Sequence, residues 1–257
     1  MDAAQIILAL ISGGLVGIAL GLVGGGGSIL AVPLLVHMVG VGSTHAAIGT
    51  AAVAVAANAL AGLTGHARAG NIKWRCAAVF ALSGVIGAAI GAEIGKAFDG
   101  AHLLTLFGWL MIGVGASMIF QRGRADDPDV RLTRETASHL LPRLVPAGLA
   151  VGLAAGFFGI GGGFLIVPAL LAATAMPIAY AVGTSLVVIT ALGLTTAASY
   201  AVSGLVDWPL TALLIAGGIA GAGAGLWLGG RLAARKRMLE RLFAVTVIAV
   251  GTFVAIG

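Results

Sequence analysis

Residues 21–35 read GLVGGGGSILAVPLL and residues 156–170 read GFFGIGGGFLIVPAL, so one glycine-rich motif occurs twice. When the copies are superposed at an offset of 135 positions, most of their glycines coincide and Pro33 falls on Pro168. Ser28 departs from this match, because it stands where the second copy has Gly163. The duplicated cluster predicts a chain built of two homologous halves.

The correspondence extends well beyond the clusters. After a slip of one residue, three further pairs of positions align, namely Thr50 with Thr184, His66 with Tyr200 and Trp74 with Trp208. A stretch rich in arginine and acidic residues separates the halves. We therefore predict a first repeat over residues 1–120, a polar cytoplasmic linker over 121–143 and a second repeat over 144–257.

Composition predicts an integral membrane protein. Of the 257 residues, 60% are hydrophobic and 9% are charged, and the mean hydropathy is +1.11. Soluble domains carry about 25% charged residues. The net charge of +5 does not indicate nucleic-acid binding, because the basic residues lie in short loops between apolar runs. The single cysteine, Cys76, excludes an internal disulfide and a CxxC site, and we expect no cofactor and no metal.

The apolar runs predict an all-α polytopic membrane protein. Eight runs are predicted as firm transmembrane helices that cross about 30 Å of hydrocarbon, over residues 3–23, 46–65, 76–94, 103–120, 144–158, 178–202, 210–228 and 239–256. Two shorter runs, 29–39 and 164–175, follow the glycine clusters. Each is either a tilted span or a broken, re-entrant segment. No lysine or arginine precedes Arg68, so we expect the first run to be retained rather than cleaved as a signal peptide.

Loop charges predict that the halves have opposite orientations. Cytoplasmic loops retain lysine and arginine, and the loop after the run 46–65 holds Arg68, Lys73 and Arg75. Its counterpart near Asp207 holds no basic residue, whereas the next loop, 231–241, holds several. We therefore predict inverted repeats in the cell inner membrane with both termini outside. This architecture is typical of secondary transporters, whose site lies where the halves meet.

The glycine clusters are the predicted anion site. Unwound backbone is tolerated within a membrane where protein or water satisfies its amides, and a helix start favours an anion. The predicted substrate-binding backbone comprises Gly24, Gly25, Gly26, Gly27, Ser28, Gly159, Gly161, Gly162 and Gly163, with Pro33 and Pro168 supporting the helix breaks. Glycines spaced by four are instead expected to serve close helix packing, at positions 13, 17, 21 and 25 and at 217, 221, 225 and 229.

The motifs GGGGSILAVPLL and GIGGGFLIVPAL resemble those of the sulfite exporter TauE/SafE family of membrane permeases, and the resemblance covers nearly the whole chain. It implies export or permeation of small sulfur-containing anions such as sulfite, sulfoacetate or related organosulfonates. The expected partners are a small anionic substrate and the lipid bilayer, with no nucleic acid. A homodimer is left open.

Polar residues inside the apolar runs are further candidates. The hydroxyl and amide groups of Thr50, Asn58, Thr184 and Ser185 could hydrogen-bond substrate oxygens, although small hydroxyls in membrane helices also bond their own backbone. His66, Arg68 and Tyr200 are candidates for gating or anion recruitment. For Arg68 the alternative is an orienting loop charge.

Glu93 is a candidate for proton coupling, because it is the carboxylate deepest in an apolar run. An ion pair with Lys96, three residues later, is the simpler alternative. His37 and His45 are expected to be structural, and Trp74 and Trp208 to be interfacial anchors.

These features favour a secondary exporter of a small oxyanion that works by alternating access, with or without a coupled ion. The alternative is a passive anion channel. No nucleotide-binding fingerprint can be written in the chain, so a nucleotide-driven pump would need another subunit. An enzyme is disfavoured, because no nucleophile, metal cluster or carboxylate pair accompanies the glycine clusters.

Overall fold

The computed structural model describes residues 2–120, 130, 132–133, 135–159, 162–231 and 236–256, and gives the surroundings of their side chains except at 22–26, 118–120, 226, 229–231 and 236–243. Within these ranges all regular structure is helical. The elements are α1 (Ala3–Val23), η1 (Gly24–Leu30), α2 (Ala31–Pro33), η2 (Leu34–Met38), α3 (Thr44–Arg68), α4 (Trp74–Ala97), α5 (Gly100–Phe120), α6 (Ala137–Phe158), α7 (Gly163–Thr174), α8 (Ile178–Val202), α9 (Trp208–Arg231) and α10 (Lys236–Ile256).

The chain is a polytopic all-α protein, as predicted. Seven helices of the described part, α1, α3, α4, α5, α6, α8 and α9, are long and apolar enough to cross a membrane. The eighth predicted span corresponds to α10, a helix of 21 residues whose side chains are described from Ala244 onward. Large apolar side chains face outward, including Leu82 at 70% and Trp109 at 62% exposure. A bilayer would cover these surfaces.

Helix α6 begins seven residues before the predicted run 144–158. Helix α6 starts at Ala137, so residues 137–143 are helical although they were predicted to belong to the linker. Pro142 and Pro146 lie inside this helix. Proline breaks helices in water because it removes an N–H and clashes with the preceding turn, but membrane helices tolerate it where neighbouring groups satisfy the freed carbonyl.

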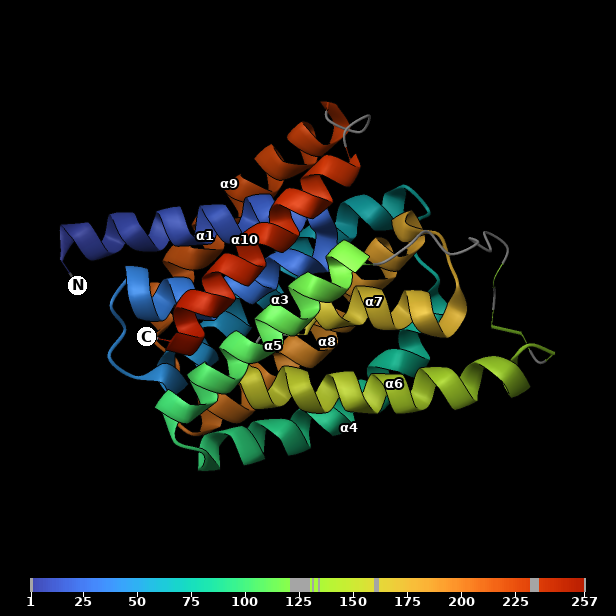
Figure 1. The fold of residues 1–257 in the computed structure, drawn as a ribbon, viewed down its shortest axis with the longest axis horizontal. Helices are drawn as coiled ribbons and strands as arrows, with labels where there is room; N and C mark the ends of the chain where they lie inside the picture. The colour runs from blue at the N-terminus through green and yellow to red at the C-terminus, as the bar shows by residue number, and fades with distance from the viewer. Residues whose placement is uncertain are drawn as a thin grey trace.

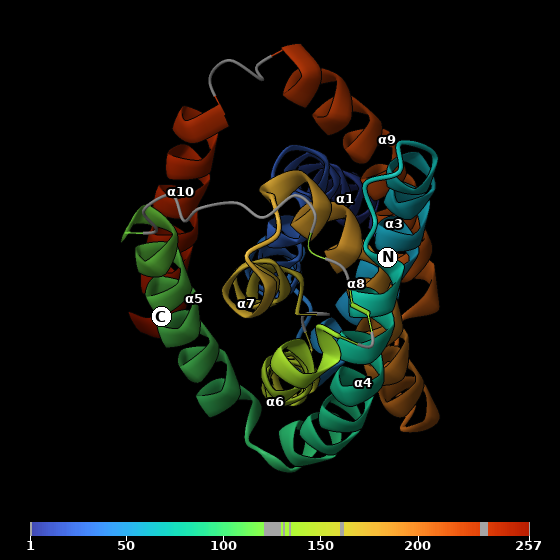
Figure 2. The ribbon, with the colours of Figure 1, turned by 90° about the vertical axis from the view of Figure 1, so that its right-hand side faces the viewer.

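The two short segments after the glycine clusters differ in conformation. The first passes through 3-10 (η1), α (α2) and π (η2) turns, whereas the second is the single helix α7, which contains Pro168. At 1.5 Å per residue, the 12 residues of α7 reach about 18 Å. This helix packs against α6, α8 and η1, and Figure 2 shows it inside the ring of longer helices.

The halves exchange helices with one another. Helix α1 of the first half packs along α9 of the second, and α6 of the second half packs along α4 of the first. Since α1 corresponds to α6 and α4 corresponds to α9, this exchange is reciprocal. Helices α5 and α10 form a third pair, and α3 packs against α8 at the centre. The three outer pairs can be followed in Figure 1.

Glycines make the outer pairs close. A Cβ added at Gly13 or Gly17 would overlap the backbone of α9, and one added at Gly152 or Gly156 would overlap the backbone of α4. The predicted packing role is confirmed for a set of glycines on α1 and α9, which are Gly13, Gly17, Gly217, Gly221 and Gly225. Gly25 and Gly229 lie outside the residues whose surroundings are described.

The order of these contacts gives the directions of equivalent helices. Between α3 and α8, Gly49 lies beside Tyr200 and Gly62 beside Leu186, so the two helices are antiparallel. The pair α5 and α10 is antiparallel as well, because Gly108 lies beside Ala255 and Gly115 beside Ile248. Each of these pairs consists of corresponding helices of the two repeats, and its members run in opposite directions.

Candidate functional site

Thr50 and Thr184, equivalent in sequence, have equivalent partners. The Oγ1 of Thr50 accepts a hydrogen bond of 3.0 Å from the backbone N–H of Asp207, and the Oγ1 of Thr184 accepts one of 3.0 Å from that of Lys73. Both side chains are fully buried. Each hydroxyl therefore ties its helix, α3 or α8, to a loop of the opposite half. The two threonines lie toward opposite ends of the antiparallel α3 and α8, so the structure does not bring them together.

The glycine before each threonine fits the same contact. A Cβ added at Gly49 would overlap the carbonyl of Leu205, and one added at Gly183 would overlap the carbonyl of Asn71. These carbonyls belong to the loops that the threonines bind. The two Gly–Thr pairs thus hold these two loops against the central helices α3 and α8. Substrate contact by the threonines remains a prediction.

In the first glycine cluster, Gly27 and Ser28 are buried in η1. A Cβ added at Gly27 would overlap the backbone of α1 at Ala19 and Leu20. For Gly24, Gly25 and Gly26 the structure describes the 3-10 backbone, whereas their surroundings lie outside the described part.

In the second cluster, Gly159 and Gly162 have left-handed backbones with φ of 66° and 69°. A side chain at either position would be strained. Gly162 caps α7 and accepts hydrogen bonds from the amides of Leu165 and Ile166, and Gly163 is buried. Gly161 lies outside the described residues. Because α7 packs against η1, the two elements that carry the clusters are in contact.

Two other candidates have contrasting surroundings. The Ser185 hydroxyl donates to Val182 O at 2.7 Å within its own helix. Asn58, which is 3% exposed, places its amide against Gly218 of α9, and its Oδ1 has no hydrogen-bond partner among the described residues. The Asn58 oxygen is therefore an acceptor that the described fold leaves unused.

The three recruitment candidates occupy two ends of the bundle. His66 is half-buried and Arg68 is exposed, in the last turns of α3. Tyr200 lies near the end of the antiparallel α8 and is fully buried. Neither His66 Nδ1 nor Tyr200 Oη meets a hydrogen-bond partner in the described part of the chain.

Glu93 forms the predicted ion pair. Its Oε1 lies 2.7 Å from the Nζ of Lys96 and accepts a hydrogen bond of 2.8 Å from Ser199 of α8. Lys96 also donates to Ser203 Oγ at 2.9 Å. The Glu93 side chain is 67% exposed. The pair therefore fastens the end of α4 to the end of α8, and proton coupling by Glu93 remains a prediction.

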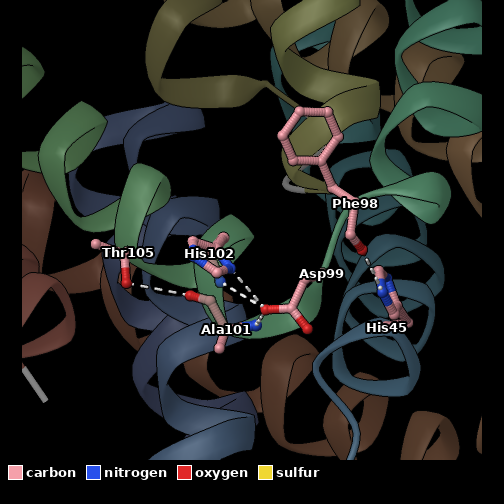
Figure 3. Close-up of polar contacts among 6 residues, drawn as sticks. All are labelled: His45, Phe98, Asp99, Ala101, His102 and Thr105. Atoms are coloured by element: carbon pink, nitrogen blue, oxygen red, sulfur yellow. Dashed lines mark hydrogen bonds and ion pairs between the residues drawn. The ribbon is translucent and has the colours of Figure 1, made fainter.

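A polar turn at the same end joins α4 to α5 (Figure 3). The Oδ2 of Asp99 accepts hydrogen bonds from the His102 ring at 2.9 Å and from the amides of Ala101 and His102. These bonds, that of the His102 side chain foremost, lower the pKa of Asp99 below its usual value. His45 of α3 hydrogen-bonds the carbonyl of Phe98 at 3.1 Å, which ties α3 to this turn.

The remaining aromatic candidates lie at the periphery. Trp74 and Trp208 begin α4 and α9 and are 57% and 60% exposed, as expected for interfacial anchors. The ring of His37 packs edge-on against Phe253 at 5.1 Å, which is a structural contact.

The sequence interpretation overlooked Thr196 of α8. This residue is fully buried, and its Oγ1 has no partner within the described ranges. It precedes Tyr200 by four residues, so the two side chains share one face of the helix. That spacing is the sequence signal that could have found it.

Chemically, the described residues offer hydroxyl, amide and backbone donors. No group of three or more histidine, cysteine or acidic side chains comes together among them to hold a metal ion. A polytopic helical chain whose halves exchange helices and whose interior carries neutral hydrogen-bonding groups has an architecture typical of membrane transporters.

Comparison with known proteins agrees. Residues 9–254 match the family described as Sulfite exporter TauE/SafE, and the chain belongs to that family. A probable membrane transporter protein of Xylella fastidiosa (strain 9a5c) is 50% identical over 99% of this chain and 96% of its own length. The probable membrane transporter protein YdhB of Bacillus subtilis (strain 168) is 30% identical over 82% of this chain and 85% of its own length. No solved structure matches the chain.

Proposed function

We propose that this transporter exports small sulfur-containing oxyanions, such as sulfite or organosulfonates of the sulfoacetate type, by alternating access. The family description supports the substrate class. The antiparallel course of corresponding helices carries the mechanism. Inverted halves are related by an approximate two-fold axis in the membrane plane, so exchanging their conformations converts an inward-open state into an outward-open one.

Within this proposal, the anion is bound without a fixed countercharge at the glycine clusters. The amides at the start of α7 and in η1 act as donors, and the left-handed Gly162 turns the chain so that α7 begins there. Ser28, Thr50, Asn58, Thr184 and Ser185 are the proposed additional contacts. The loop 69–73 faces the cytoplasm in this orientation, and the two termini lie at one end of the bundle (Figure 1), which would be outside.

Flux into proteoliposomes tests this function. Sulfite, thiosulfate, sulfoacetate and sulfate are supplied in turn to the purified full chain, with and without a pH gradient. Export by alternating access predicts saturable flux of at least one sulfite or sulfonate anion, and a response to the pH gradient would identify protons as the coupled ion. Ohmic anion currents in a planar bilayer would favour the alternative, a passive channel. A lack of flux for every anion in the panel would overturn the proposal.

A further inference from the structure

Most of the unpaired polar groups of the central helices form one pair on each helix. Five buried polar atoms of α3 and α8 have no hydrogen-bond partner within the described residues, and these are His45 Nδ1, Asn58 Oδ1, His66 Nδ1, Thr196 Oγ1 and Tyr200 Oη. His45 stands apart at the start of α3, where its other ring nitrogen bonds the carbonyl of Phe98. On α3, Asn58 and His66 are eight residues apart. On α8, Thr196 and Tyr200 are four apart. Both spacings place the members of a pair on one helix face.

The two faces are equivalent in the repeat. At the offset of 134, His66 corresponds to Tyr200, and Asn58 corresponds to Leu192, one turn before Thr196. Leu192 packs on Gly84 of α4, as Asn58 packs on Gly218 of α9. Each face therefore lies where the central pair, α3 and α8, meets one outer helix. We call the face with Asn58 and His66, and the face with Thr196 and Tyr200, the two polar seams.

The polar seams lead to opposite ends of the bundle. Because α3 and α8 are antiparallel, Asn58 and His66 run from the middle toward one end, and Thr196 and Tyr200 run from the middle toward the other. A cationic group lies near each end. The Nζ of Lys96 is 6.0 Å from the centre of the Tyr200 ring, and Arg68 follows His66 by two residues.

Unpaired groups at these depths are costly. A buried polar group without a partner costs about 1–3 kcal/mol, and more than about 90% of such groups in native proteins are paired. Helix α8 can pair threonine hydroxyls, since Thr190 and Thr195 donate to carbonyls one turn back at 2.8 Å each. Thr196 is the exception among its neighbours. Its hydroxyl is free to bind something other than its own helix.

We propose that the polar seams line the path of the transported oxyanion. Thr196 and Tyr200 donate hydrogen bonds to its oxygens in one half of the path, and His66 donates through Nδ1–H in the other half, where Asn58 lies two turns away on the same face. Hydroxyl and imidazole groups are donors suited to a small oxyanion, and the four residues include no carboxylate that would repel it. The inference rests on the proposed function and adds Thr196 to the residues that contact the substrate.

Matched variants test the seam of α8. Thr196→Val and Tyr200→Phe remove the unpaired hydroxyls and keep most of the shape. Thr195→Val and Tyr180→Phe are the controls, because the Thr195 hydroxyl bonds its own helix and the Tyr180 ring, which phenylalanine retains, lies under Lys73. We expect flux of the transported anion to fall about tenfold or more in the first two, the equivalent of one lost hydrogen bond to a charged group.

Stability separates a transport role from a structural one. Removal of an unpaired buried hydroxyl relieves a desolvation cost, so Thr196→Val should melt at the same temperature as the wild type or higher. Unchanged flux in both Thr196→Val and Tyr200→Phe, or equal losses in the controls, would overturn the proposal.

A labelling experiment decides the case even if no tested anion is carried. In a Cys76→Ala background, which removes the single cysteine, Thr196→Cys and Thr195→Cys are exposed to the anionic thiol reagent methanethiosulfonate ethylsulfonate in membrane vesicles. We expect reaction at Thr196→Cys and none at Thr195→Cys. If wild-type flux is absent but Thr196→Cys reacts, the substrate proposal fails and the anion path stands. An unreactive Thr196→Cys would contradict the path itself.

Discussion

At the residue scale, Thr50 and Thr184 are connectors between the halves. Each hydroxyl accepts the backbone N–H of a residue more than a hundred positions away, at 3.0 Å. Sequence alone predicted that the two threonines correspond. It could not predict their partners, because a hydrogen bond between a helix and a distant loop does not produce a periodic pattern in the sequence.

Substitution of these threonines should destabilise the fold. Thr50→Val or Thr184→Val leaves a partly buried amide, of Asp207 or Lys73, without its acceptor, and we expect each to lower the free energy of unfolding by about 1–3 kcal/mol. Chemical unfolding of the purified chain measures this loss. Thr184→Ser should restore most of it, and Thr190→Val is the matched control. A wild-type unfolding curve for both valine variants would mean that the hydroxyls serve the substrate alone.

Asp99 offers a prediction about pH. Hydrogen bonds from His102 and Ala101 favour its charged form, so its pKa lies below the value of about 3.9 of an unperturbed aspartate. The bonds stabilise the turn fully above that unperturbed value, and the stabilisation is lost as the pH falls through the lowered pKa. Titration of the carboxyl carbon by NMR should show this low midpoint. His102→Ala should raise the midpoint, and a wild-type midpoint at or above 3.9 would refute the assignment.

At the element scale, rows of glycines spaced by four residues, which we call glycine ladders, decide which helices pair. The spacing by four correctly predicted a packing role, but it did not reveal that α1 packs on α9 and α6 on α4. Glycines on both members of each pair are needed, and one sequence cannot show which ladders face each other. The early start of α6 was missed for a different reason, since residues 137–143 were grouped with the polar linker that precedes them.

A single methyl group tests this packing. Gly152→Ala places a Cβ against the Gly84 carbonyl, and Gly17→Ala does the same at Gly218. We expect each to destabilise by roughly 2 kcal/mol, as overpacking typically does. Gly113→Ala is the control, because nothing lies within 4 Å of the added Cβ and alanine favours a helix by about 1 kcal/mol. Thermal unfolding measures the three effects. A loss of stability in Gly113→Ala as large as in the other two variants would contradict the packing role of the glycines.

At the scale of the whole molecule, the sequence halves are interlocked rather than side by side. Each outer pair α1–α9 and α4–α6 combines one helix from each half, and α3 and α8 cross between them at the centre. A rigid movement of one half against the other would break these pairs. We therefore expect the alternating movement to occur along the seams of α3 and α8, with the exchanged pairs moving as units.

The opposite orientation of the halves is the central claim, and labelling from one side of the membrane tests it most directly. Ala69 and Ser203 are equivalent, exposed loop residues at the offset of 134. In the Cys76→Ala background, an impermeant maleimide added to intact cells should label Ser203→Cys. Ala69→Cys should react only after the membrane is permeabilised. Labelling of both positions from the outside, or of neither until permeabilisation, would contradict the inverted arrangement.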